Sequence, residues 1–379
     1  MAAMQNALTN TVFLNAIAPD WPGGFWWHWL VFSLIIILFV MGIVIGLVFF
    51  ERRVIGFFQA RRGPNRTGPF GTLQLIADGI KGLLKEDIIP STADKLVHWL
   101  APIIAFFPVF LIFAVIPFAN GAMLVDLNIG VIYILAISSI STIGIFMAGW
   151  GSSNKYSMLG AMRDVAAVVS YEIPVVLSAA SVVILAGSMS LNQIVLAQNI
   201  PYILLQPLGF LLFFISGCAE INRSPFDLLE ADSEIVAGYH TEYSGMKYLA
   251  FMIAEYSEAL AMSAIIATFF LAGWKGPLLP PWLWLIVKIF AVFFVMIWLR
   301  GTLPRVRIDQ LMALAWKFLF PLAILNLIIT GVEVLVWPAG LPWVAVPINF
   351  AITAVLILLW SRLYKFGWGR VEVHRVEQS

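Results

Sequence analysis

The chain has 379 residues, of which 61% are hydrophobic and 11% charged, and its 22 basic and 21 acidic side chains leave a net charge of +1. A soluble domain carries roughly 25% charged residues, so this composition excludes a soluble globular protein and indicates a polytopic membrane protein. Cys218 is the single cysteine, which excludes an intrachain disulfide and a cysteine-ligated iron–sulfur cluster.

Apolar runs long enough to cross a bilayer recur along the whole chain. A spanning helix needs about 20 apolar residues, and the runs lie near 26–50, 97–118, 129–150, 160–187, 203–219, 248–272, 282–300, 311–336 and 342–361. The first run is too long for the apolar region of a signal peptide, and no basic region precedes it. The predicted fold is therefore all-α, a polytopic membrane bundle of about nine spanning helices.

The basic residues are distributed unevenly between the two sides of this bundle. Of the lysines and arginines, 19 fall in alternate connections or in the C-terminal tail, and only Lys275 falls on the other side. The positive-inside rule then places the N-terminus outside and the C-terminus inside. We expect a single membrane domain over 1–379, and its inner connections are expected at 51–96, 151–163, 220–247 and 300–310. The four histidines lie near predicted helix ends or in loops, so no redox centre is expected within this chain.

The first inner connection opens with ERRVIGFFQARRGPNRTGPFG, in which five arginines accompany closely spaced glycines and prolines. Such a density of glycine and proline predicts a shaped turn. From Thr72 to Glu86 apolar and polar residues occupy opposite helical faces, which predicts an amphipathic helix in the membrane interface. Ser91 and Asp94 follow at capping-box spacing before the second span. The arginines could bind lipid headgroups, or an anionic or polar-headgroup ligand or a docking protein.

Three carboxylates lie well inside predicted spans, whereas Glu333 lies near the outer end of its span and is expected to be solvated. Glu172 lies about halfway along the fourth span, two residues before Pro174, and Glu255 and Glu258 lie three apart in the sixth. An ionisable group at mid-helix costs about 2.5–3.5 kcal/mol to insert, so these residues are candidates for proton movement. For Glu172 the alternative is a structural ion pair with a basic residue of another helix.

An acidic loop follows the fifth span, which ends at Glu220. Asp227, Glu230 and Glu234 are separated by three and four residues, so in a helix they would share one face. Mutual repulsion would raise their pKa values and prepare each acid to exchange a proton near neutral pH. The alternative is a solvated loop, which for Asp232 and Glu242 is an equally good interpretation.

The inner connections resemble a known family. ERRVIGFFQARRGPNRTGPFG, GTLQLIADGIKGLLKE, GSSNKYSMLGAMR with the later SYE, and EINRSPFDLLEADSEIVAGYHTEYSGMKYLAFMIAEY are similar to the H subunit (subunit 1) of proton-pumping NADH:quinone oxidoreductase, respiratory complex I. The resemblance extends from about Phe25 to Trp337. Leu229 stands where the family usually has a small residue or proline, and Asp232 stands where it usually has glutamate.

This resemblance implies a membrane subunit of a multisubunit translocase. The subunit completes the quinone-binding tunnel at the junction with the peripheral arm and couples quinone reduction to proton translocation. The implied tunnel residues are Glu51, Arg52, Phe57, Phe58, Arg61, Arg62 and Asp78. The implied proton path contains Glu172, Glu220, Asp227, Glu230, Asp232, Glu234 and Glu255, and Glu258 joins them by its position in the sixth span.

The resemblance also implies what lies outside the chain. Quinone is the substrate, no cofactor or metal is bound by this chain alone, and flavin and iron–sulfur clusters belong to partner subunits. The expected partners are the hydrophilic quinone-site subunits of the peripheral arm, adjacent small membrane subunits, antiporter-like subunits and lipid, with no nucleic acid. The expected location is an energy-transducing membrane, the bacterial cytoplasmic membrane.

Two other functions fit parts of the sequence. The anchor subunit of a related membrane-bound hydrogenase, or of another ion-pumping oxidoreductase, would share the fold and the carboxylates. A stand-alone secondary transporter could use Glu172 and Glu255, but transporters usually show internal repeats with broken helices at matching positions. The sequence shows no such repeat.

Overall fold

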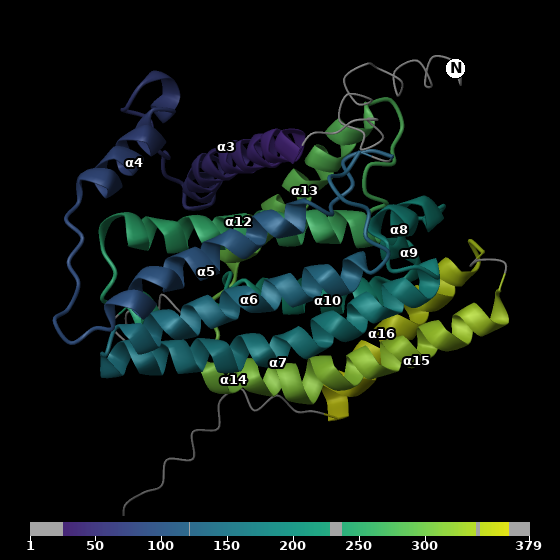
Figure 1. The fold of residues 1–379 in the computed structure, drawn as a ribbon. Helices are drawn as coiled ribbons and strands as arrows, with labels where there is room; N and C mark the ends of the chain where they lie inside the picture. Colours follow the sequence, from purple (N-terminus) through teal and green to yellow (C-terminus); the bar gives the residue numbers. More distant parts are fainter. Residues whose placement is uncertain (1–25, 121, 228–236, 339–341, 364–379) are drawn as a thin grey trace, which may run out of the picture.

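The computed structural model describes residues 26–120, 122–227, 237–338 and 342–363, and within them it is a bundle of helices with no strand (Figure 1). The helices are α3 (Trp26–Phe58), α4 (Gln74–Leu84), α5 (Lys95–Phe113), α6 (Gly130–Gly151), α7 (Lys155–Ala186), α8 (Leu191–Ala197), α9 (Tyr202–Leu205), α10 (Pro207–Glu220), α12 (Gly245–Phe270), α13 (Pro281–Thr302), α14 (Ile308–Ala313), α15 (Phe320–Val336) and α16 (Ala345–Leu363). A π-helical turn, Leu314–Leu319, joins α14 to α15. The all-α prediction is confirmed.

Eight helical segments of the described residues are long and apolar enough to cross a membrane. They are α3, α5, α6, α7, α12, α13, the continuous segment from α14 through α15, and α16. The remaining predicted span, 203–219, corresponds to α10, which has only 14 residues and follows directly after the single turn of α9. Pro207 stands at the first position of α10, where its missing N–H costs no helical hydrogen bond. The predicted orientation of the termini stays a prediction.

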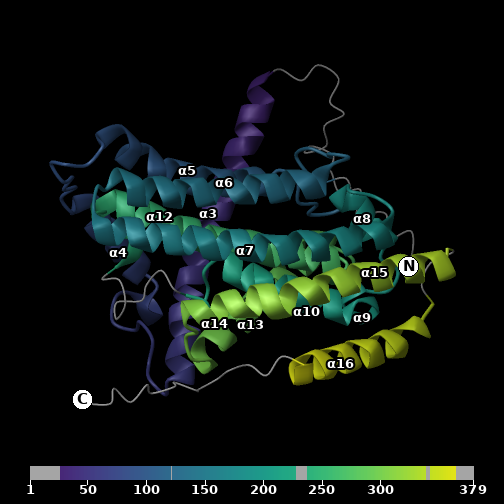
Figure 2. The same ribbon diagram turned by 90° about the horizontal axis from the view of Figure 1, so that it is seen from below.

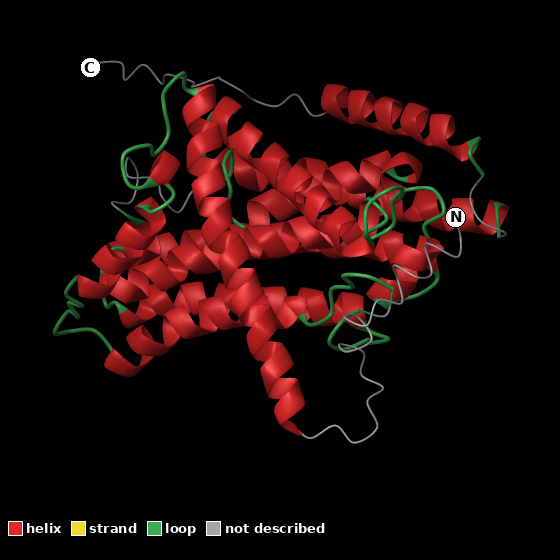
Figure 3. Ribbon diagram, turned by 90° about the horizontal axis from the view of Figure 1, so that it is seen from above, coloured by secondary structure: helices red, strands yellow, loops and turns green. Residues whose placement is uncertain are grey.

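The bundle is built around α12. Within its most apolar window 67% of α12 is buried, against 17% for α3 and α16. In Figure 1 α5, α6, α7 and α12 run side by side, whereas α3 crosses this group obliquely on one face (Figure 2). Figure 3 shows α16 at the margin of the molecule. Lipid can therefore reach α3 and α16 most easily, and the carboxylates of α12 lie inside the protein.

Glycines allow α5, α6 and α7 to pack closely. A Cβ atom on Gly144 of α6 would lie 2.6 Å from the Ala105 backbone nitrogen of α5, and one on Gly160 of α7 would lie 2.8 Å from Gly238. Helices in lipid gain association energy from van der Waals packing, so small residues are favoured where backbones meet. Gly160 thereby brings the 238–240 segment against α7.

The inner connections differ from the predicted pattern at two points. Helix α3 does not end near residue 50 but continues to Phe58, so Glu51 and Arg52 lie on a helix. The cap of α5 is Asp94, whose side chain accepts hydrogen bonds from the N–H groups of Leu96 and Val97. The capping-box prediction was therefore wrong about Ser91, because α5 begins immediately after Asp94.

The predicted amphipathic helix is present as α4. Its apolar face, Leu73, Ile76, Ile80, Leu83 and Leu84, is exposed. The connection after α4 is held to the start of α12 by the ion pair between Lys247 and Asp87 at 2.8 Å and by the hydrogen bond from the Ile88 N–H to Ser244 Oγ at 3.1 Å. The helix is thereby fixed beside α12 with its apolar face free to contact lipid.

Candidate functional site

An open cavity of about 1020 Å³ lies under the arginine-rich connection. Its lining consists of Glu51, Arg52, Ile55, Gln59, Arg61, Arg62, Gly63, Pro64, Asn65, Arg66, Gln74, Tyr256 and Arg300. Four of the seven residues implied as tunnel residues are among them. The volume matches the upper end of ligand pockets, roughly 300–1,000 Å³, and the guanidinium groups favour a polar or anionic group within it.

The other three implied tunnel residues lie beside the cavity. Asp78 of α4 pairs with Arg52 and accepts a hydrogen bond from Gln74 at 2.9 Å. Burial alone would raise the pKa of Asp78, but the hydrogen bonds from Arg52 and Gln74 outweigh burial and lower the pKa. Phe57 and Phe58 are both exposed, and the Phe58 ring lies 6.4 Å from that of Phe294. These two rings form an apolar surface at the end of α3.

A buried ion cluster connects the cavity to α12. The Arg223 guanidinium lies 3.1 Å from the Glu51 carboxylate and 3.3 Å from Glu255 Oε1, and it stacks 4.2 Å from the Tyr256 ring. Arg300 also pairs with Glu51. The side chains of Glu51 and Arg223 are only 2% and 5% exposed. Two acids thus meet two bases, which is the balance that a buried cluster requires because an unpaired buried charge is costly.

Four separate chain segments build this cluster, namely α3, the turn after α10, α12 and α13. Burial alone would lower the pKa of the Arg223 guanidinium, but Glu255 and Glu51 outweigh burial and raise it. Arg223 therefore stays charged. Because Glu51, Tyr256 and Arg300 also line the cavity, a new charge in the cavity would act directly on the cluster.

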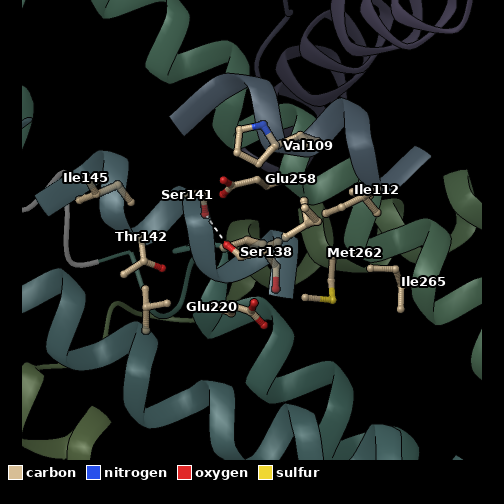
Figure 4. A pocket seen from close by; sticks show the side chains of 15 residues that line it. Val109, Ile112, Ser138, Ser141, Thr142, Ile145, Glu220, Glu258, Met262 and Ile265 are labelled. Atoms are coloured by element: carbon tan, nitrogen blue, oxygen red, sulfur yellow. Dashed lines mark hydrogen bonds between the residues drawn. The ribbon is translucent and has the colours of Figure 1, made fainter. Parts of the chain in front are cut away.

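Beyond the cluster, Glu258 and Glu220 face a second cavity of about 40 Å³ inside the bundle. Figure 4 shows the two carboxylates on either side of Ser138 and Ser141 of α6. Glu258 contacts Ser141, Glu220 contacts Ser138, and Glu220 Oε2 has no hydrogen-bond partner. A water needs about 10–15 Å³ of such volume, so the cavity has room for two or three waters between the two acids.

Glu172 extends the row of carboxylates. It accepts a hydrogen bond from Ser139 of α6 and interacts electrostatically with Glu220. Within the described parts of the chain Glu172 forms no ion pair with a basic residue of another helix. Glu220 in turn interacts with Glu258, and Glu258 with Glu255. The acids therefore form a continuous series from the ion cluster to the middle of α7.

The acidic loop is described only at its start. Asp227 is buried, and its Oδ2 lies 3.2 Å from Arg305 Nη2. The Val306 N–H donates to the Pro225 carbonyl at 3.0 Å, which joins this loop to the connection after α13. Glu230, Asp232 and Glu234 lie outside the described residues, so their predicted common face stays a prediction.

The site also contains residues that sequence reasoning did not select. Asp164 of α7 is buried, its carboxylate lies beside Asn222, and it interacts electrostatically with Glu255 and Asp227. An acid inside a predicted span was the signal for Asp164. The run of hydroxyls at 138–142, inside an otherwise apolar span, was the signal for Ser138 and its neighbours, because hydroxyl side chains in a membrane helix hydrogen-bond to neighbouring helices.

Two acids for which the sequence allowed or predicted a solvated position have a hydrogen-bond partner or are buried. Glu242 accepts a hydrogen bond from Asn154 Nδ2, at the start of α7. Glu333 was predicted to be solvated near an outer helix end, but its side chain is buried with 7% exposed. The prediction was wrong because α16 covers this end of α15 and places Asn349 beside Glu333. In the described residues no group of three or more His, Cys, Asp and Glu side chains could hold a metal ion.

Comparison with known proteins gives one consistent result. The sequence model of a family described as NADH dehydrogenase matches residues 30–331. Three relatives are each named as the H subunit of NADH-quinone oxidoreductase. The protein of Dehalococcoides mccartyi strain CBDB1 is 61% identical over 349 residues, covering 92% of this chain and 99% of the relative. That of Geobacillus thermodenitrificans is 49% identical over 79% of this chain and 92% of the relative. That of Bacillus thuringiensis is 47% identical over 81% of this chain and 95% of the relative.

Proposed function

We propose a function from one premise: the chain belongs to the NADH dehydrogenase family and, within it, to the H subunits of NADH-quinone oxidoreductase, respiratory complex I. It is therefore a multi-pass membrane subunit of that oxidoreductase, with partner subunits in the complex and quinone as the substrate of the whole enzyme. The names of the relatives favour this function over a hydrogenase anchor or a stand-alone transporter.

The first part of the proposal is that the cavity under the arginine-rich connection receives the quinone headgroup. Glu51, Arg52, Arg61 and Arg62 line it, and guanidinium groups can hydrogen-bond the oxygens of a reduced, negatively charged ring. Asp78 holds Arg52 toward α4. Phe57 and Phe58, exposed at the end of α3, would contact the apolar quinone tail as it enters from the membrane.

The second part is that quinone reduction is coupled to proton movement through the carboxylate series. The observation that carries it is the double role of Glu51, which lines the cavity and binds Arg223, the partner of Glu255. Added negative charge on the ring competes with Glu51 for the arginines, and the change is passed to Glu255. Such a local charge event can have a distant result if the next groups exchange protons.

Glu258, Glu220 and Glu172 are those next groups. The serines and the space for water between them allow protons to pass without large movements of the side chains. The acidic loop, Asp227, Glu230, Asp232 and Glu234, would supply or sense protons at the inner side.

The remaining chain would serve assembly. We infer one membrane domain whose inner connections, 51–96, 151–163, 220–247 and 300–310, receive the hydrophilic quinone-site subunits of the peripheral arm. Flavin and iron–sulfur clusters would reside in partner subunits. Small membrane subunits, antiporter-like subunits and lipid would cover the sides of the bundle, in the bacterial cytoplasmic membrane.

The test compares an arginine that lines the cavity with one that does not. Arg62→Ala should lower quinone-dependent activity more than electron transfer to a hydrophilic artificial acceptor at the donor end, because Arg62 lines the cavity. Arg53→Ala is the matched control, since Arg53 stacks outside the cavity on Phe49, 5.5 Å from the ring centre. Equal losses in both assays for Arg62→Ala would point to misassembly and contradict the proposed headgroup site.

A further inference from the structure

Lys317 is a basic side chain inside a membrane-spanning segment. It belongs to the segment Ile308–Val336, which is long and apolar enough to cross a membrane, and its side chain is exposed. In the described parts of the chain no salt bridge joins it to an acid. Charged residues in spans are rare and usually face the protein interior. An exposed lysine in this segment therefore points to a counter-charge from outside the chain.

The depth of Lys317 in the membrane follows from helix lengths. The segment has 29 residues, or about 44 Å at 1.5 Å per residue, whereas the hydrocarbon core is about 30 Å thick. With Trp337, the next residue, in the interface at one end, the other end extends about 14 Å, or about nine residues, beyond the hydrocarbon. Lys317 is then level with this boundary. The last turn of α16 reaches the same level, because the Trp360 Nε1–H donates to the Lys317 carbonyl at 2.9 Å.

Pro321 explains why the Lys317 carbonyl is available to Trp360. A proline has no N–H for the carbonyl four residues before it, and its ring crowds that carbonyl. The chain widens here into the π-helical turn that joins α14 to α15. The Trp316 Nε1–H donates to Ser170 Oγ at 3.2 Å, although Trp316 is 48% exposed. Two tryptophans thus fix the turn that carries Lys317, at the depth where tryptophans and basic residues meet lipid headgroups.

An apolar surface suited to acyl chains begins at this turn. Ile324, Ile328 and Val332 of α15 are exposed, and their spacing of four residues places them on one helical face. From Trp316 to Ile328 the exposed residues extend over about 18 Å, which is more than the depth of one leaflet of hydrocarbon, about 15 Å. Arg362, exposed in the last turn of α16, adds a second positive charge on the same side of the membrane.

We propose that Lys317 is the headgroup site of one anionic phospholipid, whose phosphate pairs with the ammonium group and whose acyl chains lie along the exposed face of α15. A lysine ammonium binds phosphate as a compact point charge, and basic groups between spans, on the side where positive charge gathers, are suited to anionic lipid headgroups. The site goes beyond the proposed quinone function. It lies beside α16 at the margin of the bundle (Figure 2).

The test uses the assembled complex in nanodiscs of phosphatidylcholine that contain a small fraction of a photoactivatable lipid. One probe is phosphatidylglycerol with a diazirine near the glycerol end of an acyl chain, and the other is phosphatidylcholine with the same diazirine and no net charge. After illumination, crosslinks are located by mass spectrometry in chymotryptic peptides, because cleavage by chymotrypsin does not depend on Lys317. The result is the ratio of labelling by the two probes.

In the wild type, phosphatidylglycerol should label the segment from Leu314 to Ile328 at least about fivefold more than phosphatidylcholine, the preference that one basic residue contributes near an anionic headgroup. Lys317→Gln should remove this preference, and Lys317→Arg should retain it because the charge is kept. Lys155→Gln is the matched control, at an exposed lysine that begins α7, and should leave the ratio unchanged. Assembly of each variant is checked on native gels.

Three results would overturn the site. Equal labelling by the two probes in the wild type would mean that only non-specific lipid surrounds α15. Absence of labelling by both probes would mean that a partner subunit covers this face. A preference that survives in Lys317→Gln would mean that another group binds the headgroup. If Lys317→Gln does not assemble, the ratios for the wild type and Lys317→Arg decide, since the proposal requires the same preference in both.

Discussion

Replacing Arg223 tests the charge balance of the buried cluster most directly. Arg223→Met keeps an unbranched side chain of similar length but leaves Glu51 and Glu255 with Arg300 as the one remaining base of the cluster. Removing one partner of a buried ion pair costs about 3–5 kcal/mol because an uncompensated charge remains. At 1.4 kcal/mol for each tenfold change, the correctly folded subunit should become at least about a hundredfold less favoured relative to its unfolded form.

The compensating variant decides whether charge is the reason. Arg223→Met combined with Glu255→Gln removes one charge of each sign and leaves Glu51 paired with Arg300. Most of the lost stability should return, although the coupling of quinone reduction to proton pumping should not, because Glu255 is gone. This stability is measured by heating the solubilised complex and following the intact species on native gels. The wild type, Arg223→Met, Glu255→Gln and the double variant form a double-mutant cycle.

The matched control is Arg52→Met. Arg52 pairs with Asp78, but their side chains are 44% and 30% exposed, and an exposed pair contributes only about 0–1 kcal/mol. A loss for Arg52→Met as large as that for Arg223→Met, or a double variant no more stable than Arg223→Met, would refute the reasoning from burial and charge balance.

Further substitutions probe the proton path, the acidic loop and the helix packing. Glu172→Gln should leave the complex assembled but lower quinone-driven proton pumping in vesicles, and wild-type pumping would contradict its place in the proton path. Glu230→Gln or Glu234→Gln should change the pH profile of quinone reductase activity, and profiles that overlay the wild type for both variants would reduce the acidic loop to a solvated segment. Gly144→Val should prevent assembly seen on native gels, because even a Cβ there would lie 2.6 Å from Ala105 N, whereas Gly79→Ala, with nothing within 4 Å, should assemble normally.

The spans could be predicted because the bilayer imposes a length and a polarity on each of them. Helix ends were less predictable. Hydropathy falls at Glu51 and Arg52, yet both are good helix formers, so α3 continues until the turn in which the Arg61 N–H bonds the Gly56 carbonyl at 2.9 Å. Glu333 was misjudged for a related reason, since its position near a helix end says nothing about a later helix that folds over it.

The contacts of the site could not be read from local patterns. Arg223 and Glu51 are 172 positions apart in the sequence, and no periodicity links them. Sequence reasoning found acids inside spans because these are costly, and family resemblance supplied the cavity residues. Sequence reasoning did not select Arg223 as a site residue, because the positive-inside rule alone already accounts for an arginine in an inner connection.

The structure divides the buried acids into two kinds, and the division suggests where proton movement begins. Glu51 and Glu255 are bound by arginines, so a change in their protonation must also break an ion pair. Glu258, Glu220 and Glu172 meet serine hydroxyls in the described residues, and each can gain or lose a proton while its hydrogen-bond partners only reorient. The ion cluster is therefore suited to sense charge in the cavity and the serine-lined acids are suited to carry the proton, with the step from Glu255 to Glu258, one turn along α12, as the point where the first becomes the second.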